Sequence, residues 1–216
     1  MQGIGAVRRR TIIFAVISVL FIGVLVAADQ LTKLYFGNLL KNGGTEVVIK
    51  DFFFFTYTLN TGSAYGFLQD AEWAQTFFLI LTPISVALFG YFYIFAYKKG
   101  YKTLLVALAL VIGGAVGNYI DRAAYRAVTD FICIEIGGNA IFGVFNVADV
   151  ELTAGVILVV VHLCFLDKNA IFRKTDKQSA AESANNQVVV KADSSENSEK
   201  TKENRSDSDI KDGKEV

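Results

Sequence analysis

The sequence predicts an all-α integral membrane protein: a four-transmembrane-helix bundle with a small β-rich region and a disordered C-terminal tail. Two observations lead to this prediction. The 216 residues are 53% hydrophobic, and positions 167–216 hold 21 of the 42 charged side chains. The first 166 residues therefore contain long apolar runs, which a soluble domain would interrupt with charge every few residues. The formal net charge of +0 also excludes a nucleic-acid binder that works through bulk positive charge.

Four stretches have the length and polarity of bilayer-spanning helices, which need about 20 mainly apolar residues to cross about 30 Å of hydrocarbon. They are 11–28, 73–97, 103–120 and 146–166. The uninterrupted apolar parts of the last two are short, and 15 helical residues reach only about 22 Å. We therefore expect both helices to include the polar residues at one end.

The N-terminal stretch has a second interpretation. Three arginines, Arg8 to Arg10, precede an apolar core that ends in small residues before Asp29, a pattern that imitates a cleavable secretory signal. The core of 18 residues is longer than the roughly 7 to 15 of such signals, which favours a retained span.

Basic residues orient the four helices, because cytoplasmic loops and flanks carry an excess of Lys and Arg. Ten basic residues lie before the first helix, between the second and third, or just after the fourth, and five lie in the other two connections. The sequence thus predicts a multi-pass membrane protein with both termini cytoplasmic. Segments 29–72 and 121–149 would face outward.

Residues 46–66 form the expected β-rich region. They contain β-branched and aromatic residues and then the turn composition Asn60-Thr61-Gly62-Ser63. We expect short strands on the outer face of the membrane, which either shelter a lipid-linked substrate or simply pack on the helix ends.

Two domains are predicted. Residues 1–166 would form the membrane domain, and residues 167–216 a charged cytoplasmic tail with too few apolar residues to offset its ordering entropy. Cys133 and Cys164 should lie at opposite ends of the membrane and form no disulfide. No Cys/His metal spacing or phosphate-binding glycine loop occurs, so neither a metal nor another cofactor is expected.

Polar residues gather at the outer helix ends with spacings of three and four, which place them on one helix face. Ionisable groups at membrane depth are costly unless they are paired, so by default they indicate a functional site. One interpretation is an ion-pair network that holds helix ends together, with Arg122 paired to Asp121 or Asp29. The residues concerned are Asp29, Lys33, Asn118, Asp121 and Arg122.

Asp130 and Asp149 differ, because each lies in an apolar stretch without a basic neighbour. Two carboxylates close together in a partly dehydrated site share a proton, since both cannot easily ionise. One can then take a proton from water while the other donates one to a carbonyl oxygen or leaving amine. This chemistry hydrolyses a peptide without metal or covalent intermediate, although spacing alone does not establish that the two aspartates meet.

Five motifs resemble those of the lipoprotein signal peptidase family, the bacterial signal peptidase II of the A8 aspartyl type. They are ADQLTK (28–33), NTGSAYG (60–66), GGAVGNYIDR (113–122), TDF (129–131) and FNVAD (145–149). They agree with the family in order, spacing and expected membrane position, and the resemblance covers about residues 10 to 166.

The resemblance implies a four-helix membrane enzyme with an extracytoplasmic β-rich cradle. Its substrates would be prolipoproteins cut just before the lipobox cysteine, once that cysteine carries diacylglycerol. The catalytic dyad would be Asp130 and Asp149, and inhibition by globomycin-type cyclic peptides is implied. The substrate- and dyad-positioning residues would be Asp29, Lys33, Asn60, Gly62, Asn118, Asp121, Arg122 and Asn146.

Two rival functions remain open at this stage. One is a small transporter that uses Asp149 as a proton-coupled carboxylate, although transporters place such groups near the bilayer midplane. The other is a non-enzymatic assembly factor with a structural ion-pair network, which would tolerate Asp130→Asn.

Overall fold

The computed structural model describes residues 2–62 and 71–167. Residues up to Val161 form one compact unit, and residues from His162 onward belong to a second, whose described part includes a π-helical turn, His162–Leu166. The elements of the first unit are α1 (Gln2–Leu40), β1 (Glu46–Ile49), β2 (Phe53–Asn60), α2 (Ala74–Lys99), α3 (Lys102–Tyr125), β3 (Val128–Ile136), β4 (Asn139–Phe145) and α4 (Val147–Val161).

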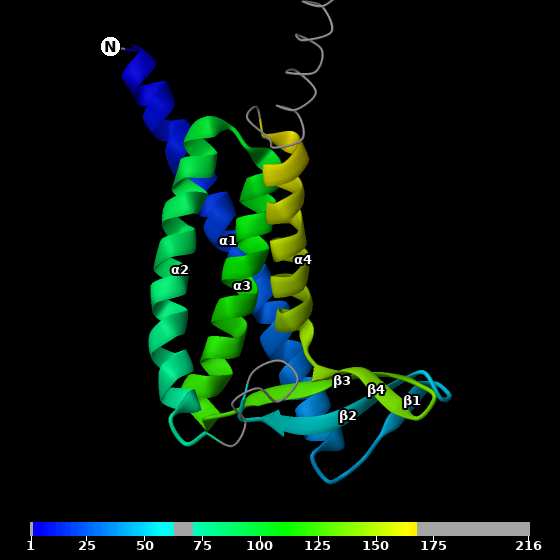
Figure 1. The fold of residues 1–216 in the computed structure, drawn as a ribbon. Coiled ribbons are helices and arrows are strands. Elements are labelled where there is room, and N and C mark those ends of the chain that lie inside the picture. The colour runs from blue at the N-terminus through cyan, green and yellow to red at the C-terminus, as the bar shows by residue number, and fades with distance from the viewer. Residues whose placement is uncertain (1, 63–70, 168–216) are drawn as a thin grey trace, which may run out of the picture. The chain divides into compact units, whose positions relative to one another are not determined.

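The helices of the first unit lie side by side, and the sheet lies at the end where α1 and α3 finish and α2 and α4 begin (Figure 1). Within the described residues, four helical segments are long and apolar enough to cross a membrane: Arg9–Leu40, Ala74–Lys99, Lys102–Tyr125 and Val147–Leu166. The four predicted helices are thus confirmed. As expected from length, the third includes its polar end and the fourth starts beside Asn146.

Helix α1 is longer than predicted, because the sequence suggested an end at Ala28 and the helix continues to Leu40. The charged residues that suggested an end are buried, and Lys33 Nζ lies 2.8 Å from Asp29 Oδ2. Pairing within the protein removes the need to expose these charges. The turn after α1 includes Gly43, whose φ of 85° lies in the left-handed region that favours glycine.

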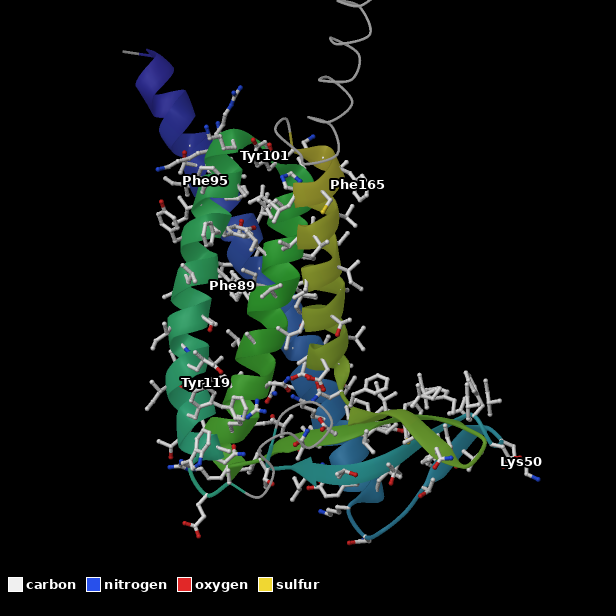
Figure 2. The ribbon with its side chains drawn as sticks, viewed as in Figure 1. Lys50, Phe89, Phe95, Tyr101, Tyr119 and Phe165 are labelled. Atoms are coloured by element: carbon white, nitrogen blue, oxygen red, sulfur yellow. The ribbon has the colours of Figure 1, made fainter. Side chains whose placement is uncertain are left out.

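Helix α3 is the most buried of these helices. In its apolar stretch 56% is buried inside the protein, against 6% in that of α1 and 0% in that of α2. Glycines let its neighbours approach closely, as small residues do at helix contacts in membranes. A Cβ at Gly117 would lie 2.5 Å from Asp29 Oδ2 on α1, and one at Gly114 would collide with the carbonyl oxygen of Ala148 on α4. Nearer the other end, α2 and α3 pack around a small core of Ala96, Leu104 and Leu108, with Phe89 and Tyr101 against it (Figure 2).

The sheet has four antiparallel strands in the order β1-β2-β3-β4. The short strands expected within residues 46–66 are confirmed as β1 and β2. Strands β3 and β4 were not predicted, although β3 is rich in β-branched residues and ends at a Gly137-Gly138 turn with φ values of 63° and 81°. A β-branched run followed by two glycines is typical of a strand and its hairpin turn, so the sequence does carry a signal for these strands.

Some predictions lie outside the described residues. They are the structure of Ser63 to Gly66 and the disorder of the tail, of which only Asp167 is described. Cys133 and Cys164 are both free cysteines, as expected.

Candidate functional site

Most of the buried polar side chains gather where α1, α3 and α4 meet the sheet, and Figure 2 shows oxygen and nitrogen atoms at this end of the bundle. Eight of the ten predicted site residues are buried there: Asp29, Lys33, Gly62, Asn118, Asp121, Arg122, Asp130 and Asn146. The other two, Asp149 and Asn60, join the same hydrogen-bond network. The structure therefore brings all ten together.

Asp149 is held by the first turn of α4. The Asn146 side-chain oxygen accepts the N–H of Asp149 at 3.0 Å, and Asp149 Oδ2 accepts the N–H of Asn146 at 3.2 Å. This reciprocal pair is a capping box, which satisfies two backbone donors of the helix start. A carboxylate in the first helical turn is also favoured by the helix dipole.

Asp130 is held by the sheet and by the start of α4. Strands β2 and β3 pair with Thr58 opposite Asp130, which brings Asn60 close to the aspartate. Asn60 Nδ2 donates to Asp130 Oδ2 at 2.9 Å, and Asn146 Nδ2 donates to Asp130 Oδ1 at 2.6 Å. Asn146 therefore contacts both aspartates, one through its amide nitrogen and the other through its amide oxygen and backbone.

Asn118 on α3 completes this connection. Its Nδ2 donates to Asp149 Oδ1 at 2.9 Å, while its Oδ1 accepts from Lys33 Nζ at 2.9 Å and Asn146 Nδ2 at 3.1 Å. The side chains that donate to the two carboxylates are thus neutral amides. Lys33 reaches Asp149 only indirectly, through its hydrogen bond to Asn118.

The electrostatics of Asp130 fit a proton retained in the site. Burial, and then the neighbouring Asp149 carboxylate, raise the pKa of Asp130 from 3.8 to about 7, while hydrogen bonds from Asn60 and Asn146 act in the opposite direction. A carboxyl whose pKa is raised in this way keeps its proton up to about neutral pH.

The ion pairs differ from those expected. Lys33, rather than Arg122, pairs with Asp29 at 2.8 Å and approaches Asp121 at 3.6 Å. The predicted pairing of Arg122 with Asp121 or Asp29 was wrong. Arg122 instead donates from Nη2 to the Gly62 carbonyl at 2.9 Å, and its guanidinium lies 4.6 Å from the centre of the Phe78 ring.

Arg122 is engaged by the turn that follows β2, so it is not paired with Asp29 or Asp121. The Gly62 N–H is donated to Asn60 Oδ1 at 2.9 Å, so the turn fixes the side chain that reaches Asp130. Gln75 on α2 also donates to the Thr61 carbonyl. Arg122 from α3 and Gln75 from α2 thus hold the turn, while the Phe78 ring packs against the Arg122 guanidinium.

Three residues of the site region were not predicted: Gln30, Gln75 and Phe78. Gln30 lies beside Asp29 in the ADQLTK motif, and its polar side chain within an apolar helix was a usable signal. Gln75 and Phe78 carry no such signal, because only the fold brings α2 against the turn at residues 60–62.

Comparison with known proteins identifies the family. A sequence model of the family described as Signal peptidase (SPase) II, Peptidase_A8, matches residues 20–165, which is more than half of the chain. The chain belongs to this signal peptidase II family. A relative named lipoprotein signal peptidase from Clostridium tetani is 39% identical over 147 residues, 68% of this chain and 90% of that protein. The protein of the same name from Bacillus subtilis is 40% identical over 139 residues, 64% of this chain and 87% of that one.

Solved structures agree with the signal peptidase II assignment. A bacterial membrane enzyme determined by the in meso method at 2.3 Å resolution is 38% identical, with a TM-score of 0.60 over 68% of this chain and 86% of that one. A second, at 1.9 Å resolution, is 35% identical, with a TM-score of 0.58 over 68% and 92%. With its four membrane-length helices, this signal peptidase II family member is a multi-pass bacterial membrane protein.

Proposed function

We propose that this protein removes the signal peptide from diacylglyceryl-modified prolipoproteins, cutting the peptide bond before the lipidated cysteine. Family membership supports the class of enzyme. The observation that carries the proposal is the pair Asp130 and Asp149, joined through the single side chain of Asn146. Diacylglyceryl prolipoproteins and membrane lipids are then the partners of the site.

In the proposed mechanism the two aspartates hold one proton between them and bind the attacking water. The ionised carboxylate takes a proton from the water as it attacks the scissile carbonyl carbon, and the protonated one donates to the carbonyl oxygen. The tetrahedral intermediate then collapses as the carboxyl that took the water proton passes it to the leaving amine. The other carboxylate takes a proton back from an oxygen of the intermediate, which restores the single proton of the pair. Asn60, Asn118 and Asn146 keep both carboxylates oriented through these steps.

Substrate binding would come mainly from the lipid. The helices expose many large apolar side chains, among them Ile17, Leu20 and Ile84. Buried acyl chain contributes about 0.8 kcal/mol per CH₂ in the limit. We therefore expect specificity for the diacylglyceryl group and for small residues before the cysteine, and inhibition by globomycin-type cyclic peptides.

A gel-shift cleavage assay in detergent tests the proposal. The substrate is a prolipoprotein with or without diacylglycerol, and the variants are Asp130→Asn and Asp149→Asn. Asp51→Asn is the matched control, because Asp51 is exposed in the loop between β1 and β2. We expect the parent and the control to cut the lipidated substrate before its cysteine, with a chelator present or absent, and both dyad variants to be folded but inactive.

Two outcomes would contradict the proposal. A parent that is inert towards lipidated substrate would refute the activity, and near-parent cleavage by either dyad variant would refute the dyad. The transporter alternative is less well supported, because Asp149 lies in the first turn of α4 rather than at mid-helix. Tolerance of Asp130→Asn would favour a structural role.

A further inference from the structure

Two buried carboxylates hold the backbone beside the aspartate pair. Asp29 Oδ1 on α1 accepts the N–H of Ala148 at 3.0 Å, and Asp121 Oδ2 on α3 accepts the N–H of Thr129 at 2.9 Å. Ala148 directly precedes Asp149, and Thr129 directly precedes Asp130. We call Asp29 and Asp121 the anchoring carboxylates, because each fixes the main chain next to one member of the pair.

Gln30 connects the two anchoring carboxylates. Its Nε2 lies 3.1 Å from Asp29 Oδ2 and 3.0 Å from Asp121 Oδ1, and 3.1 Å from the Gly117 carbonyl oxygen. Its nitrogen therefore contacts the oxygen of each carboxylate that is not used for the backbone N–H. The amide carries two hydrogens for three acceptors, so at least one of them is shared.

The chemistry of the position favours a neutral donor. Lys33 already supplies the positive charge, at 2.8 Å from Asp29 and 3.6 Å from Asp121. A carboxylate at position 30 would place a third negative charge against two others, whereas an apolar side chain would leave their oxygens short of a donor. An amide donates to both carboxylates without changing the charge of the cluster.

We propose that Gln30 is a positioning residue that couples the two anchoring carboxylates and thereby fixes the placement of Asp130 relative to Asp149. The inference rests on the proposed function for its catalytic consequence. Gln30 itself touches neither aspartate of the pair in the contacts described and acts only through Asp29 and Asp121.

The kinetic test compares Gln30→Leu and Gln30→Glu with the parent on the lipidated prolipoprotein. Misplacement of reacting groups by about 1 Å costs about 100-fold in rate, so we expect kcat to fall by about 10- to 100-fold while KM changes by less than about threefold. Glu has the same shape as Gln and should lose more than Leu at neutral pH. If packing alone mattered, Gln30→Glu would stay near the parent.

Thr32→Val is the matched control, because Thr32 is on the same helix, is half-buried like Gln30, and donates only to carbonyls of its own helix, those of Ala28 and Asp29. It should keep parent kinetics. Equal kcat in Gln30→Leu, Gln30→Glu and the parent would overturn the inference.

Hydrogen exchange followed by mass spectrometry tests the coupling without any activity. Loss of Gln30 should speed exchange in peptides that contain Thr129 and in peptides that contain Ala148, because both anchoring bonds loosen. Thr32→Val should change neither. Unchanged exchange at both places in Gln30→Leu would overturn the inference, even if the variant is less stable overall.

The two proposals fail in different ways. An inert parent refutes the peptidase function, while exchange still decides the coupling. An active parent whose Gln30 variants match it in rate and in exchange refutes only the role of Gln30.

Discussion

At the scale of single residues, the site depends on amides that each serve two partners. Asn146 caps α4 and also donates to Asp130, and Asn118 accepts from Lys33 while it donates to Asp149. Buried polar groups are costly unless they are satisfied, so each of these side chains is constrained on both sides. This constraint holds two carboxylates near each other, and no cation of residues 2–62 or 71–167 forms an ion pair with either.

Asp130 should make stability depend on pH. Its carboxyl titrates near 3.8 when the chain is unfolded and at about 7 in the fold. Between these values the folded state holds a proton that the unfolded state lacks, so the free energy of unfolding should fall as pH rises from about 4 to about 7. Asp130→Asn removes this contribution, so its melting temperature should improve relative to the parent across that range.

Thermal unfolding in detergent at several pH values measures this difference, with exposed Asp51→Asn as control. Parallel curves for Asp130→Asn and the parent would show that Asp130 does not hold a proton in the fold. Cleavage should also decline as pH rises through about 7, because loss of the shared proton leaves two negative charges and no acid.

Lys33 should be essential for stability. It is 4% exposed and Asp29 is 0% exposed, so Lys33→Met would leave Asp29 and Asp121 buried without their cation. Removing one partner of a buried ion pair costs about 3–5 kcal/mol. The free energy of unfolding of Lys33→Met should fall by that amount, while Lys41→Met at an exposed position should match the parent. Equal denaturation midpoints would contradict the role of this pair.

At the scale of elements, two short connections place the aspartates. Helix α3 ends at Tyr125, and the next residue, Arg126, caps it with a left-handed φ of 59°. One residue later the chain enters β3, which carries Asp130. Strand β4 passes through Asn146 directly into α4, which carries Asp149. Because β3 and β4 are neighbours in the sheet, two residues 19 positions apart reach the same end of α3.

The glycine face of α3 should be as important as the polar residues. Gly117→Ala would put a methyl group 2.5 Å from Asp29 Oδ2, which must shift and release its bonds to Lys33 and Ala148. We expect loss of activity and a destabilisation of about 1–3 kcal/mol, as for overpacked cores. Gly90→Ala on α2 meets nothing within 4 Å and serves as control. Thermal unfolding and cleavage are measured for both variants. A fully active Gly117→Ala would argue against close contact between α1 and α3 at this position.

At the scale of the whole molecule, polar and apolar surfaces are separated. Long apolar faces cover the helices, whereas the buried charges gather at the end that carries the sheet (Figures 1 and 2). Under the proposed function, a lipid-anchored substrate would approach from the membrane and meet the aspartates at its border. The proposal then requires the sheet to lie on the side of the membrane on which prolipoproteins are processed.

The orientation can be tested by labelling. Lys50, at the tip of the sheet (Figure 2), and Lys99, at the end of α2, are both exposed. In a background with Cys133→Ala and Cys164→Ala, Lys50→Cys should react with a membrane-impermeant maleimide in intact cells. Lys99→Cys should react only after permeabilisation, because basic loops stay in the cytoplasm. The reverse labelling pattern would contradict the predicted orientation.

The sequence by itself determined the four helices and the set of polar residues at one end, because span length and the cost of buried charge are local properties of the chain. The length needed to cross the bilayer predicts that the third helix extends to Asp121 and that the fourth begins near Asn146. The cost of buried charge predicted that α1 ends at Ala28, before Asp29. The helix continues to Leu40 because Asp29 and Lys33 are paired inside the protein, which the sequence does not reveal.

The tertiary structure decided which groups meet. It formed the sheet around β3, turned Arg122 towards Gly62 instead of Asp121, and brought Gln30 between two carboxylates that lie 92 residues apart. These contacts depend on strand register and on the close approach of α1 and α4 to the glycines of α3. Contacts between residues far apart in the chain produce no local sequence pattern. The length of an apolar stretch and the position of charges within it are visible directly in the sequence.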